Sequence, residues 1–465
     1  MALSRQSAPP RILVLGGGYV GLYTALRLQS RLRKGEAQVT VVDPQSYMTY
    51  QPFLPEASAG SLSPRHVVVP LRRVLRRCTV INARVVALDH GRHSVRLAPL
   101  SGPEYDYPYD IVVVALGSVA RTLPIPGLAE FGVGFKTIEE AIHLRNQVLS
   151  RLDVAESTPD AERRRRALTF VFVGGGYAGV EAIAELGDMA VDALRHHRSV
   201  RPEDLRFLLV EASDRILPEV DPDMGRYTVD QLRRQGIDVR LRTRLTSCTD
   251  GHVVLDDGTR LDTDTLVWTA GVKANPVLGD LGLPLDDRGR LRCTEHLRVE
   301  GVPGAWGAGD AAAVPDLGAP AGQVRFCAPS AQHAVRQAGR LADNVLAELR
   351  GRGTVPYRHV NAGSVASLGL HRGVAQIYGI KLRGLPAWLM HRTYHLSRVP
   401  TLNRKVRVMA DWTLALFFRR ETVSLGSLAH PFGQFAAAAA TRQPGERVRP
   451  TPGAPARPTR PGNHS

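Results

Sequence analysis

Cysteine is scarce in this sequence, with four residues among 465. They are Cys78, Cys248, Cys293 and Cys327, and no two of them have the C-x-x-C or C-x-x-x-x-C spacing. Closely spaced pairs are the usual sign of a zinc site or a local redox disulfide. The sequence therefore predicts no metal centre, and so few cysteines are typical of a protein from a reducing compartment.

Long apolar runs are also missing. No stretch reaches the ~18 apolar residues of a membrane-spanning helix. The run Ile12–Leu15 is short and leads directly into three glycines, so we expect neither a transmembrane helix nor a signal peptide. With 43% hydrophobic and 22% charged residues, the composition is that of a globular protein rather than a disordered or fibrous one.

Acidic residues are rare in the C-terminal third, and the net charge of +16 is unevenly distributed. The segment Val355–Glu421 carries +9 and residues 436–465 carry +4, which leaves +3 for the rest of the chain. Such a basic segment indicates an anionic partner. Because no nucleic-acid-binding module accompanies the charge, we expect an anionic membrane surface and no nucleic acid. The alternative is that the arginines reflect only a compositional habit of the source.

One pattern occurs twice along the chain. Arg11–Leu28 and Thr169–Leu186 each begin with a short β-branched apolar run, continue through closely spaced glycines, and end with apolar residues at helical spacing. This order is typical of a strand, a tight turn and a helix. Two such units predict an α/β protein with two nucleotide-binding domains.

The first unit contains a G-x-G-x-x-G pattern, formed by Gly16, Gly18 and Gly21. The first glycine permits a tight turn, the second lets the backbone approach a pyrophosphate, and the third allows the helix to pack closely on the strand. The phosphates then meet free N–H groups at the helix N-terminus. Asp43 ends the next strand, 22 residues after Gly21, where a ribose-binding carboxylate belongs.

The second unit repeats the pattern with Gly174, Gly176 and Gly179. The next strand ends at Glu211, 32 residues after Gly179, and a polar insert accounts for the longer spacing as a loop. A carboxylate at this place favours NADH over NADPH because it repels a 2′-phosphate, although the nearby Arg215 weakens this preference. The alternative is that Glu211 is only a solvated strand end.

Two further apolar runs end at glycines. Asp110–Gly117 is expected to be a buried strand of the first domain, and Thr265–Gly271 has the same form in the second. Their terminal residues, Gly117 and Gly271, are therefore candidates for cofactor binding.

Three more motifs carry a resemblance to a known family. Gly304–Asp310 resembles the second FAD motif, Tyr50–Glu56 resembles a stretch that runs beside the flavin, and Ala328–Gln337 resembles an alanine–glutamine segment next to the flavin and quinone. Together with the glycine patterns, they make Arg11–Glu421 similar to the two-dinucleotide flavoproteins. Within these, the chain resembles the type II NADH dehydrogenases, which are NADH:quinone oxidoreductases.

The resemblance implies two Rossmann-like dinucleotide-binding domains, the FAD domain being interrupted by the NAD domain, and a basic amphipathic C-terminal module that faces the membrane. The expected boundaries are a flexible N-terminus at 1–10, a FAD-binding domain at 11–125 and 300–350, an NAD(P)H-binding domain at 126–299, a membrane or interface module at 355–430, and a disordered tail at 436–465.

The resemblance also implies cofactors and site residues. It implies non-covalently bound FAD and NADH as the substrate, with Gly309, Asp310, Ala331 and Gln332 at the flavin. Glu181, expected in the first turn of the second glycine-loop helix, would be the catalytic residue at the nicotinamide–flavin contact, in NADH positioning or proton handling. The alternative is a structural carboxylate favoured by the helix dipole.

One departure from the family concerns the second glutamine of the alanine–glutamine segment. The family often has it four residues after the first, where this chain has Arg336, followed by Gln337. On a helix, a shift of one residue rotates the side chain by ~100°. The sequence therefore supports quinone as the acceptor less strongly than it supports FAD and NADH.

The expected function is transfer of two electrons from NADH through FAD to menaquinone or ubiquinone, without proton pumping, on the cytoplasmic face of the cell membrane. The apolar residues expected to insert into the bilayer are Trp388, Leu389, Trp412, Leu416 and Phe417. The alternatives for the C-terminal module are a subunit interface, and hence a homodimer, or a packed core. Three other functions remain open: a soluble NAD(P)H-dependent reductase with another acceptor, a sulfide:quinone-type oxidoreductase, and a regulatory flavoprotein with slow turnover.

Overall fold

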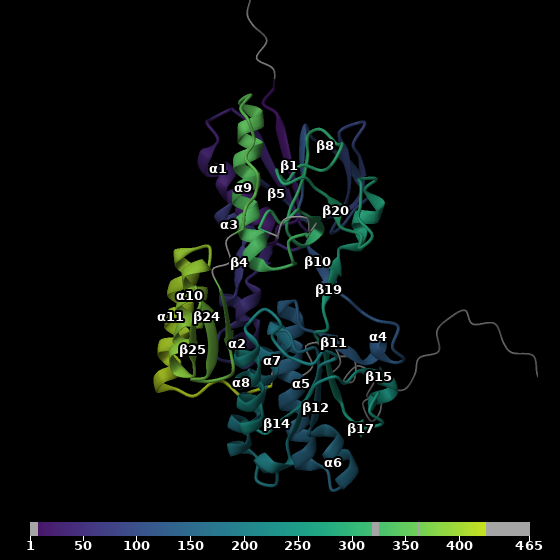
Figure 1. Ribbon diagram of the computed structural model, residues 1–465, viewed down its shortest axis with the longest axis vertical. Helices are drawn as coiled ribbons and strands as arrows, with labels where there is room; N and C mark the ends of the chain where they lie inside the picture. Colours follow the sequence, from purple (N-terminus) through teal and green to yellow (C-terminus); the bar gives the residue numbers. More distant parts are fainter. Residues whose placement is uncertain (1–7, 319–324, 360–362, 425–465) are drawn as a thin grey trace, which may run out of the picture. The chain divides into compact units, whose positions relative to one another are not determined.

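The computed structural model describes residues 8–318, 325–359 and 363–424. Most of the predicted flexible N-terminus, the last residues of the C-terminal module and the whole predicted tail lie outside the described residues. Two five-stranded parallel sheets form the framework of the described chain (Figure 1). They confirm the predicted α/β class with two Rossmann-like cores.

The first sheet has the strand order β21-β9-β1-β2-β5, and every pairing is parallel. Its strands are β1 (Arg11–Leu15), β2 (Gln38–Val42), β5 (Thr79–Ile81), β9 (Ile111–Val114) and β21 (Ala305–Gly307). The central strand β1 is almost wholly buried, as expected for an apolar run that is covered on both faces. Because β21 pairs with β9, the chain returns to this sheet after it has built the second one.

The second sheet has the order β11-β18-β12-β13-β14, again with parallel pairings. Its strands are β11 (Gly132–Gly134), β12 (Thr169–Val173), β13 (Arg206–Val210), β14 (Ile237–Arg240) and β18 (Thr265–Trp268). The chain passes between the two sheets twice, and the two connecting strands, β10 (Ser118–Ala120) and β19 (Val272–Ala274), pair with each other antiparallel.

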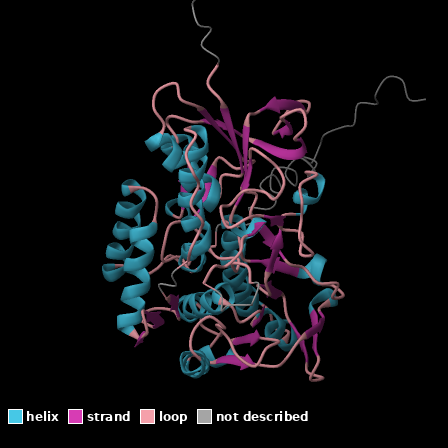
Figure 2. Ribbon diagram, turned by 45° about the horizontal axis from the view of Figure 1, so that its top comes forward, coloured by secondary structure: helices cyan, strands magenta, loops and turns pink. Residues whose placement is uncertain are grey.

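Helices pack against both parallel sheets (Figure 2). Each parallel sheet with its surrounding elements is called a lobe, the first lobe being the one that contains β1. In the first lobe, α1 (Tyr19–Arg31) and α9 (Ala331–Leu349) lie side by side (Figure 1). Both glycine-loop helices, α1 and α7 (Tyr177–Ala193), begin directly after the glycines. The other helices up to this point of the chain are α2 (Leu54–Ser58), α3 (Leu71–Val74), α4 (Leu128–Phe131), α5 (Ile138–Ser157), α6 (Ala161–Ala167) and α8 (Pro222–Arg234).

Several two- and three-stranded sheets lie outside the two parallel sheets. The antiparallel ones comprise β3 (Tyr47–Thr49) with β4 (Val68–Pro70); β6 (Ala83–Asp89), β7 (Ser94–Pro99) and β8 (Tyr105–Pro108); and β15 (Leu245–Ser247), β16 (His252–Leu255) and β17 (Arg260–Asp262). The short strands β20 (Leu291–Arg292) and β22 (Ala312–Ala313) form a parallel pair.

The C-terminal module begins with the antiparallel sheet β23 (Ser364–Ser367), β24 (Gly373–Ile377) and β25 (Ile380–Arg383). The helix α10 (Leu385–Arg398) packs on this sheet, and α11 (Leu402–Phe417) follows it (Figure 1). Across the described residues, every helix is too short or too polar to cross a membrane.

The prediction that Trp388 and Trp412 insert into a bilayer is wrong, because the protein itself surrounds them. Trp388 is buried beneath the guanidinium of Arg392, whose central carbon lies 3.9 Å from the ring centre. Trp412 is half-buried, and its Nε1 donates a hydrogen bond to Glu56 at 2.6 Å. Most of the large exposed apolar residues of this module lie instead on α10 and α11: Leu385, Leu389, Leu402, Val406, Met409, Leu414, Leu416 and Phe417. Others, among them Tyr378 and Ile380, lie outside these two helices.

Candidate functional site

The first glycine loop connects β1 to α1. Gly16 has a φ of +106°, and a Cβ there would lie 2.3 Å from the carbonyl oxygen of Ala115. A Cβ on Gly21 would lie 1.7 Å from the carbonyl oxygen of Gly16, so only glycine lets the helix pack this closely on the loop. In contrast, no atom lies within 4 Å of a Cβ built on Gly18. The middle glycine therefore faces open space at the N-terminus of α1, where phosphates bind.

The second loop, from β12 to α7, has the same construction. Gly174 has a φ of +115°, and a Cβ on Gly179 would lie 2.0 Å from the carbonyl oxygen of Gly174. Gly176 has ordinary extended backbone and, like Gly18, no atom within 4 Å of a built Cβ. Each of the two glycine loops thus leaves open space at a helix N-terminus.

The two predicted ribose carboxylates hold these loops in shape. Asp43 Oδ2 accepts a hydrogen bond from the N–H of Gly17 at 2.6 Å, and Glu211 Oε2 accepts the equivalent bond from Gly175 at 2.6 Å. Burial raises the pKa of Asp43, although two backbone N–H groups partly offset the effect. Because both carboxylates are only half-buried, each has a side open to the loop mouth.

Arg215 does not face the ribose position of the second loop. Its Nη2 donates to the carbonyl oxygens of Pro218, at 2.8 Å, and of Val220, so the guanidinium stabilises the loop in which Arg215 itself lies. The structure therefore gives no reason for Arg215 to weaken a preference for NADH.

The remaining predicted glycines mark tight turns at the ends of strands. Gly117, Gly271 and Gly309 have φ values of +65°, +95° and +69°. Gly309 precedes Asp310, and its N–H donates to Oε1 of the buried Gln337 at 2.7 Å. Gln337, which lies one residue later than the second glutamine often found in the resembling family, thus contacts the second FAD motif.

Ala331 and Gln332 begin α9. Ser330 caps this helix by accepting a hydrogen bond from the N–H of His333 at 3.2 Å, and the amide nitrogen of Gln332 donates to the carbonyl oxygen of Gly363 at 3.4 Å. One turn further on, Arg336 Nη1 lies 3.1 Å from Nδ1 of His359. The start of α9 is therefore tied to the C-terminal module through polar side chains.

Asp310 belongs to a polar cluster that the sequence did not reveal. Its Oδ2 accepts a hydrogen bond from Ser118 Oγ at 2.5 Å, and Lys136 Nζ donates to the same hydroxyl at 2.7 Å. Lys136 Nζ also lies 4.0 Å from Asp310. Burial lowers the pKa of Lys136, while Asp310 and Glu140 act in the opposite direction. A partly buried cation therefore stands beside the acidic residue of the second FAD motif.

Glu181 is buried where α7 meets the C-terminal module. It is the fifth residue of α7, just past the first turn in which the sequence placed it. Its Oε1 accepts a hydrogen bond from the N–H of Ser367 at 2.8 Å and lies 3.1 Å from Nε2 of the buried His391. One turn later, burial raises the pKa of Glu185, whose Oε1 accepts from Ser367 Oγ at 3.0 Å. The helix dipole alone does not account for a carboxylate this deeply buried.

Two histidines of α10 continue the cluster from Glu181. Burial opposes a charge on His391, but the contact with Glu181 outweighs it and raises the pKa of His391. Burial and the charge of His391 both lower the pKa of His395. His395 Nδ1 lies 3.2 Å from the hydroxyl of Tyr50, which belongs to the stretch predicted to run beside the flavin. Two imidazoles whose pKa values are shifted in opposite directions therefore stand in series between Glu181 and Tyr50.

Glu56, from the same stretch, is held by the C-terminal helices. Its Oε2 accepts from Trp412 at 2.6 Å and from Arg392 Nη2 at 3.4 Å. The sequence analysis did not identify four residues of these clusters, because their partners lie far away along the chain and no local spacing marks them: Lys136, His391, Arg392 and His395. Among the described residues, no group of three His, Cys, Asp or Glu side chains is arranged to hold a metal ion.

The cysteines lack the surroundings of reactive thiols. Burial raises the pKa of Cys78 and of Cys327 to about 11, and it raises that of Cys293 as well. Reactive cysteines need a lowered pKa, because the thiolate is the nucleophile. These three thiols stay protonated at neutral pH, which argues against sulfide chemistry.

Comparisons with known proteins agree with this geometry. The family model described as pyridine nucleotide-disulphide oxidoreductase matches residues 9–338. A demethylphylloquinone reductase from Synechocystis sp. is 33% identical over 87% of this chain and 96% of its own length. A type II NADH:quinone oxidoreductase from Staphylococcus haemolyticus is 30% identical over 82% of this chain and 93% of its own. One from Mycobacterium tuberculosis is 29% identical over 89% and 90%.

Among solved structures, NDH2 from Plasmodium falciparum in complex with NADH matches with a TM-score of 0.83. The match covers 89% of this chain and 99% of that one at 17% identity, so it speaks for the fold alone. Both the fold and the curated relatives confirm the family that the sequence motifs predicted. The chain belongs to the type II NADH:quinone oxidoreductases, within the pyridine nucleotide-disulphide oxidoreductase family.

Proposed function

We propose that this chain oxidises NADH through non-covalently bound FAD and reduces a membrane quinone, menaquinone or ubiquinone, without pumping protons. The observation that carries the proposal is the pair of glycine loops, each with an open middle glycine and a carboxylate at the end of the neighbouring strand. Stopped-flow mixing with NADH should bleach the flavin absorbance, and subsequent mixing with a quinone should restore it. A flavin that NADH leaves oxidised would contradict the proposal.

The first lobe has the features that FAD needs. Gly16, Gly18 and Gly21 would hold its pyrophosphate, Asp43 its ribose, and Asp310 the ribityl chain, with Gly117, Gly309, Ala331 and Gln332 around it. When bound, FAD supplies the chemistry of accepting a hydride and releasing electrons. We propose 11–125 and 300–350 as the FAD-binding domain, 126–299 as the NADH-binding domain with Gly174, Gly176, Gly179, Glu211 and Gly271, and 355–430 as the membrane module.

Glu181 and His391 would manage a proton beside the reaction centre. Quinone reduction consumes two protons, and a buried site needs groups that hold them. The carboxylate of Glu181 stabilises a proton on Nε2 of His391, 3.1 Å away. His395, one turn further along α10, has its ring against that of His391 and its Nδ1 3.2 Å from the hydroxyl of Tyr50. Because Glu181 and His391 are buried, they would hold an exchangeable proton away from bulk water.

We expect the substitution Glu181→Gln to slow turnover by about 100-fold, in the range of a lost acid–base contribution, without loss of flavin. The amide is isosteric and still accepts from Ser367, but it no longer supports a charge on His391. Stopped-flow rates of both half-reactions and the flavin content would be measured. Glu185→Gln is the matched control, since it neutralises the carboxylate one turn later on α7. Wild-type rates for Glu181→Gln would return the residue to a purely structural role.

We expect the substitution Glu211→Gln to reduce the preference for NADH over NADPH by at least about tenfold. At ~4 Å and an effective dielectric constant near 20, two like charges repel by about 4 kcal/mol, which is an upper guide for a half-exposed site. The measurement is the ratio of kcat/KM for the two nucleotides. Asp214→Asn removes the same charge from an exposed neighbour and should leave the ratio unchanged. An unaltered ratio in Glu211→Gln would mean that Glu211 does not read the ribose.

We further propose that the enzyme attaches peripherally to the cytoplasmic face of the cell membrane through the C-terminal module. The helices α10 and α11 combine exposed apolar residues with basic ones such as Lys405 and Arg407, the composition of an interfacial helix pair. A homodimer formed through this face is the competing use of the surface. Mass measurement in solution, with and without detergent, separates the two, because a dimer interface persists without lipid.

A further inference from the structure

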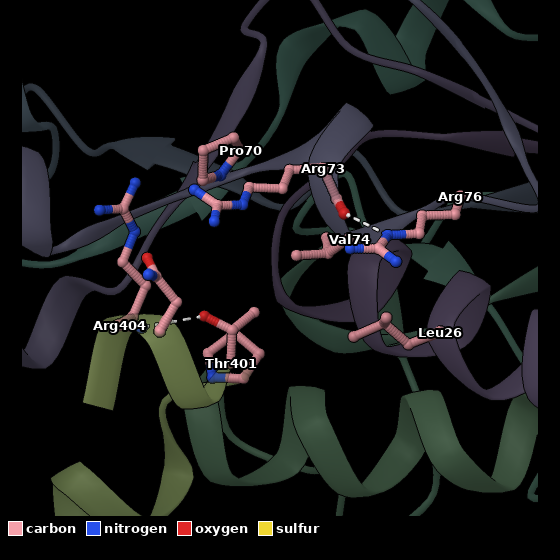
Figure 3. A pocket seen from close by; sticks show the side chains of 9 residues that line it. Leu26, Pro70, Arg73, Val74, Arg76, Thr401 and Arg404 are labelled. Carbon is pink, nitrogen blue, oxygen red and sulfur yellow. Dashed lines mark hydrogen bonds between the residues drawn. The ribbon is translucent and has the colours of Figure 1, made fainter. Parts of the chain in front are cut away.

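A pocket of about 380 Å³ lies between α1, α3 and the start of α11, and it shares no lining residue with either glycine loop. Three arginines line it, Arg73 and Arg76 from the first lobe and Arg404 from α11. In Figure 3, the side chains of Arg73 and Arg404 converge on one side of the pocket, and Arg76 lies beside Leu26 on the other. Two segments more than 300 residues apart in the sequence thus bring their positive charges together.

The charges in this pocket have no counter-charge. None of the lining residues is acidic. Within the described part of the chain, the guanidinium groups of Arg73 and Arg404 form no hydrogen bond or ion pair, and Arg76 reaches only a carbonyl oxygen, at 3.4 Å. The situation of Arg27, next to Leu26 on α1, is the opposite, because its guanidinium makes two bonds of 2.7 Å to Asp343. At Arg27, therefore, a carboxylate neutralises an arginine of the same lobe.

The convergence of like charges has an energetic cost that an anion would remove. Arg404 is half-buried, and burial together with the charges of Arg407 and Arg73 lowers its pKa. Like charges held close together disfavour the charged form, and a bound anion reverses that effect. Arginine presents a planar set of donors that matches the oxygens of a phosphate. Thr401 and Asn403 add neutral polar groups at the rim.

We propose that this pocket binds the phosphate group of a glycerol phosphate ester, with the guanidinium groups of Arg73, Arg76 and Arg404 around the phosphate oxygens. The apolar part of the lining, which includes Leu26 and Pro400, faces the carbon part of the ligand. The volume lies within the range of small-molecule pockets. The ester has two sources, a soluble glycerol phosphate or the headgroup of an anionic phospholipid.

The position of the pocket favours the lipid source. The exposed apolar face of α11 starts at Leu402, directly after the lining residue Thr401, and Leu402 is 77% exposed. A headgroup in the pocket would therefore have its acyl chains beside the face proposed to enter the bilayer. Only the lipid source rests on the proposed membrane attachment, since phosphate binding in the pocket does not require it.

The test uses the double variant Arg73→Gln/Arg76→Gln in the full-length holoenzyme. Both residues lie outside the basic C-terminal module, so the variant leaves the charge of that module intact. The matched control is Arg163→Gln/Arg165→Gln on α6, which removes the same charge from exposed arginines of the second lobe. Equal flavin content and equal melting temperatures show that all proteins are folded.

The first measurement is calorimetric titration with glycerol 3-phosphate at constant ionic strength, with chloride as the reference anion. We expect the wild type and the control to bind with the same Kd, and Arg73→Gln/Arg76→Gln to bind at least tenfold more weakly. Absence of binding by the wild type, or equal binding by all three proteins, overturns the proposal.

The second measurement separates the two sources. Vesicles of phosphatidylcholine with phosphatidylglycerol are compared with phosphatidylcholine vesicles given the same surface charge by oleate. Two basic residues near an anionic surface contribute about 1 kcal/mol each, so we expect an about thirtyfold loss of binding to the phosphatidylglycerol vesicles in Arg73→Gln/Arg76→Gln and little loss in the control. A pocket that binds glycerol 3-phosphate while vesicle binding is unaffected identifies the soluble ester as the ligand. Vesicle binding that fails for every protein contradicts the membrane attachment but leaves the pocket assignment intact.

Discussion

The substitution Gly18→Val should yield a folded protein without flavin. Gly18 has a φ of −71°, which valine adopts readily, and a Cβ there meets no protein atom within 4 Å. The branched side chain would instead fill the space in which the pyrophosphate meets the N-terminus of α1. Charge-assisted hydrogen bonds contribute about 1.5–3 kcal/mol each, so losing two of them weakens flavin binding by roughly 10²- to 10⁴-fold. The flavin absorbance of the purified protein, relative to its protein absorbance, measures the effect.

The same substitution in the second loop is the matched control. Gly176 has a similar φ of −73° and equally open surroundings. Gly176→Val should keep the flavin but lose its reduction by NADH, so the two variants separate the cofactor loop from the substrate loop. Full flavin content in Gly18→Val, or loss of flavin in Gly176→Val alone, would show that the lobes have been assigned the wrong way round or that the first loop binds no flavin.

The parts of the fold that could be predicted from sequence are those with a local cause. Each glycine loop needs a strand, a positive φ at its first glycine and a close helix at its third, and all three requirements fall within about a dozen neighbouring residues. The geometry at Gly16 and Gly174 accordingly matches the pattern that identified them. The parallel sheets follow for the same reason, since buried β-branched runs mark their central strands.

The contacts that surround Glu181 had no such local cause. His391 lies more than 200 residues away in the sequence, and nothing in its neighbours on α10 distinguishes a buried ion-pair partner from a solvated histidine. Lys136 likewise precedes a helix, where the sequence alone would predict a solvent-exposed side chain. In the structure, its ammonium group lies beside Asp310. Only the tertiary packing decides which of these side chains lose water.

The tryptophans show how composition alone misleads. Trp388 and Trp412 stand among basic residues and large aliphatics, a mixture typical of interfacial helices. A tryptophan also carries an N–H group that seeks a partner when buried, and Glu56 supplies one to Trp412 at 2.6 Å. The sequence could not reveal this carboxylate, which lies 356 residues away. The exposed apolar surface of α10 and α11 therefore consists of aliphatic side chains and Phe417 and does not include Trp388.

The double substitution Val406→Asp/Met409→Asp should release the enzyme from anionic vesicles. Val406 and Met409 are 54% and 53% exposed and lie three residues apart, on the same face of α11 as Leu402. Burying a large apolar side chain contributes about 1.5–3 kcal/mol, so removing two such contributions weakens binding by about 3–6 kcal/mol, roughly 10²- to 10⁴-fold. Co-sedimentation with vesicles of phosphatidylcholine and phosphatidylglycerol measures the loss. Because neither residue touches a glycine loop, reduction of the flavin by NADH should be unchanged.

The control for this variant places the same charges on apolar residues elsewhere. Leu100 and Val191 are 75% and 48% exposed, the first at the end of β7 and the second on α7. Leu100→Asp/Val191→Asp should bind vesicles nearly as the wild type does, since the two residues lie outside the C-terminal module. The variant Val406→Asp/Met409→Asp should also lose more turnover with a long-chain quinone in vesicles than with a short soluble analogue, because only the long-chain substrate must be taken from the bilayer. Vesicle binding equal to that of the control would mean that the apolar face of α11 is covered by a second copy of the chain, and the mass of the variant in solution would then fall from that of a dimer to that of a monomer.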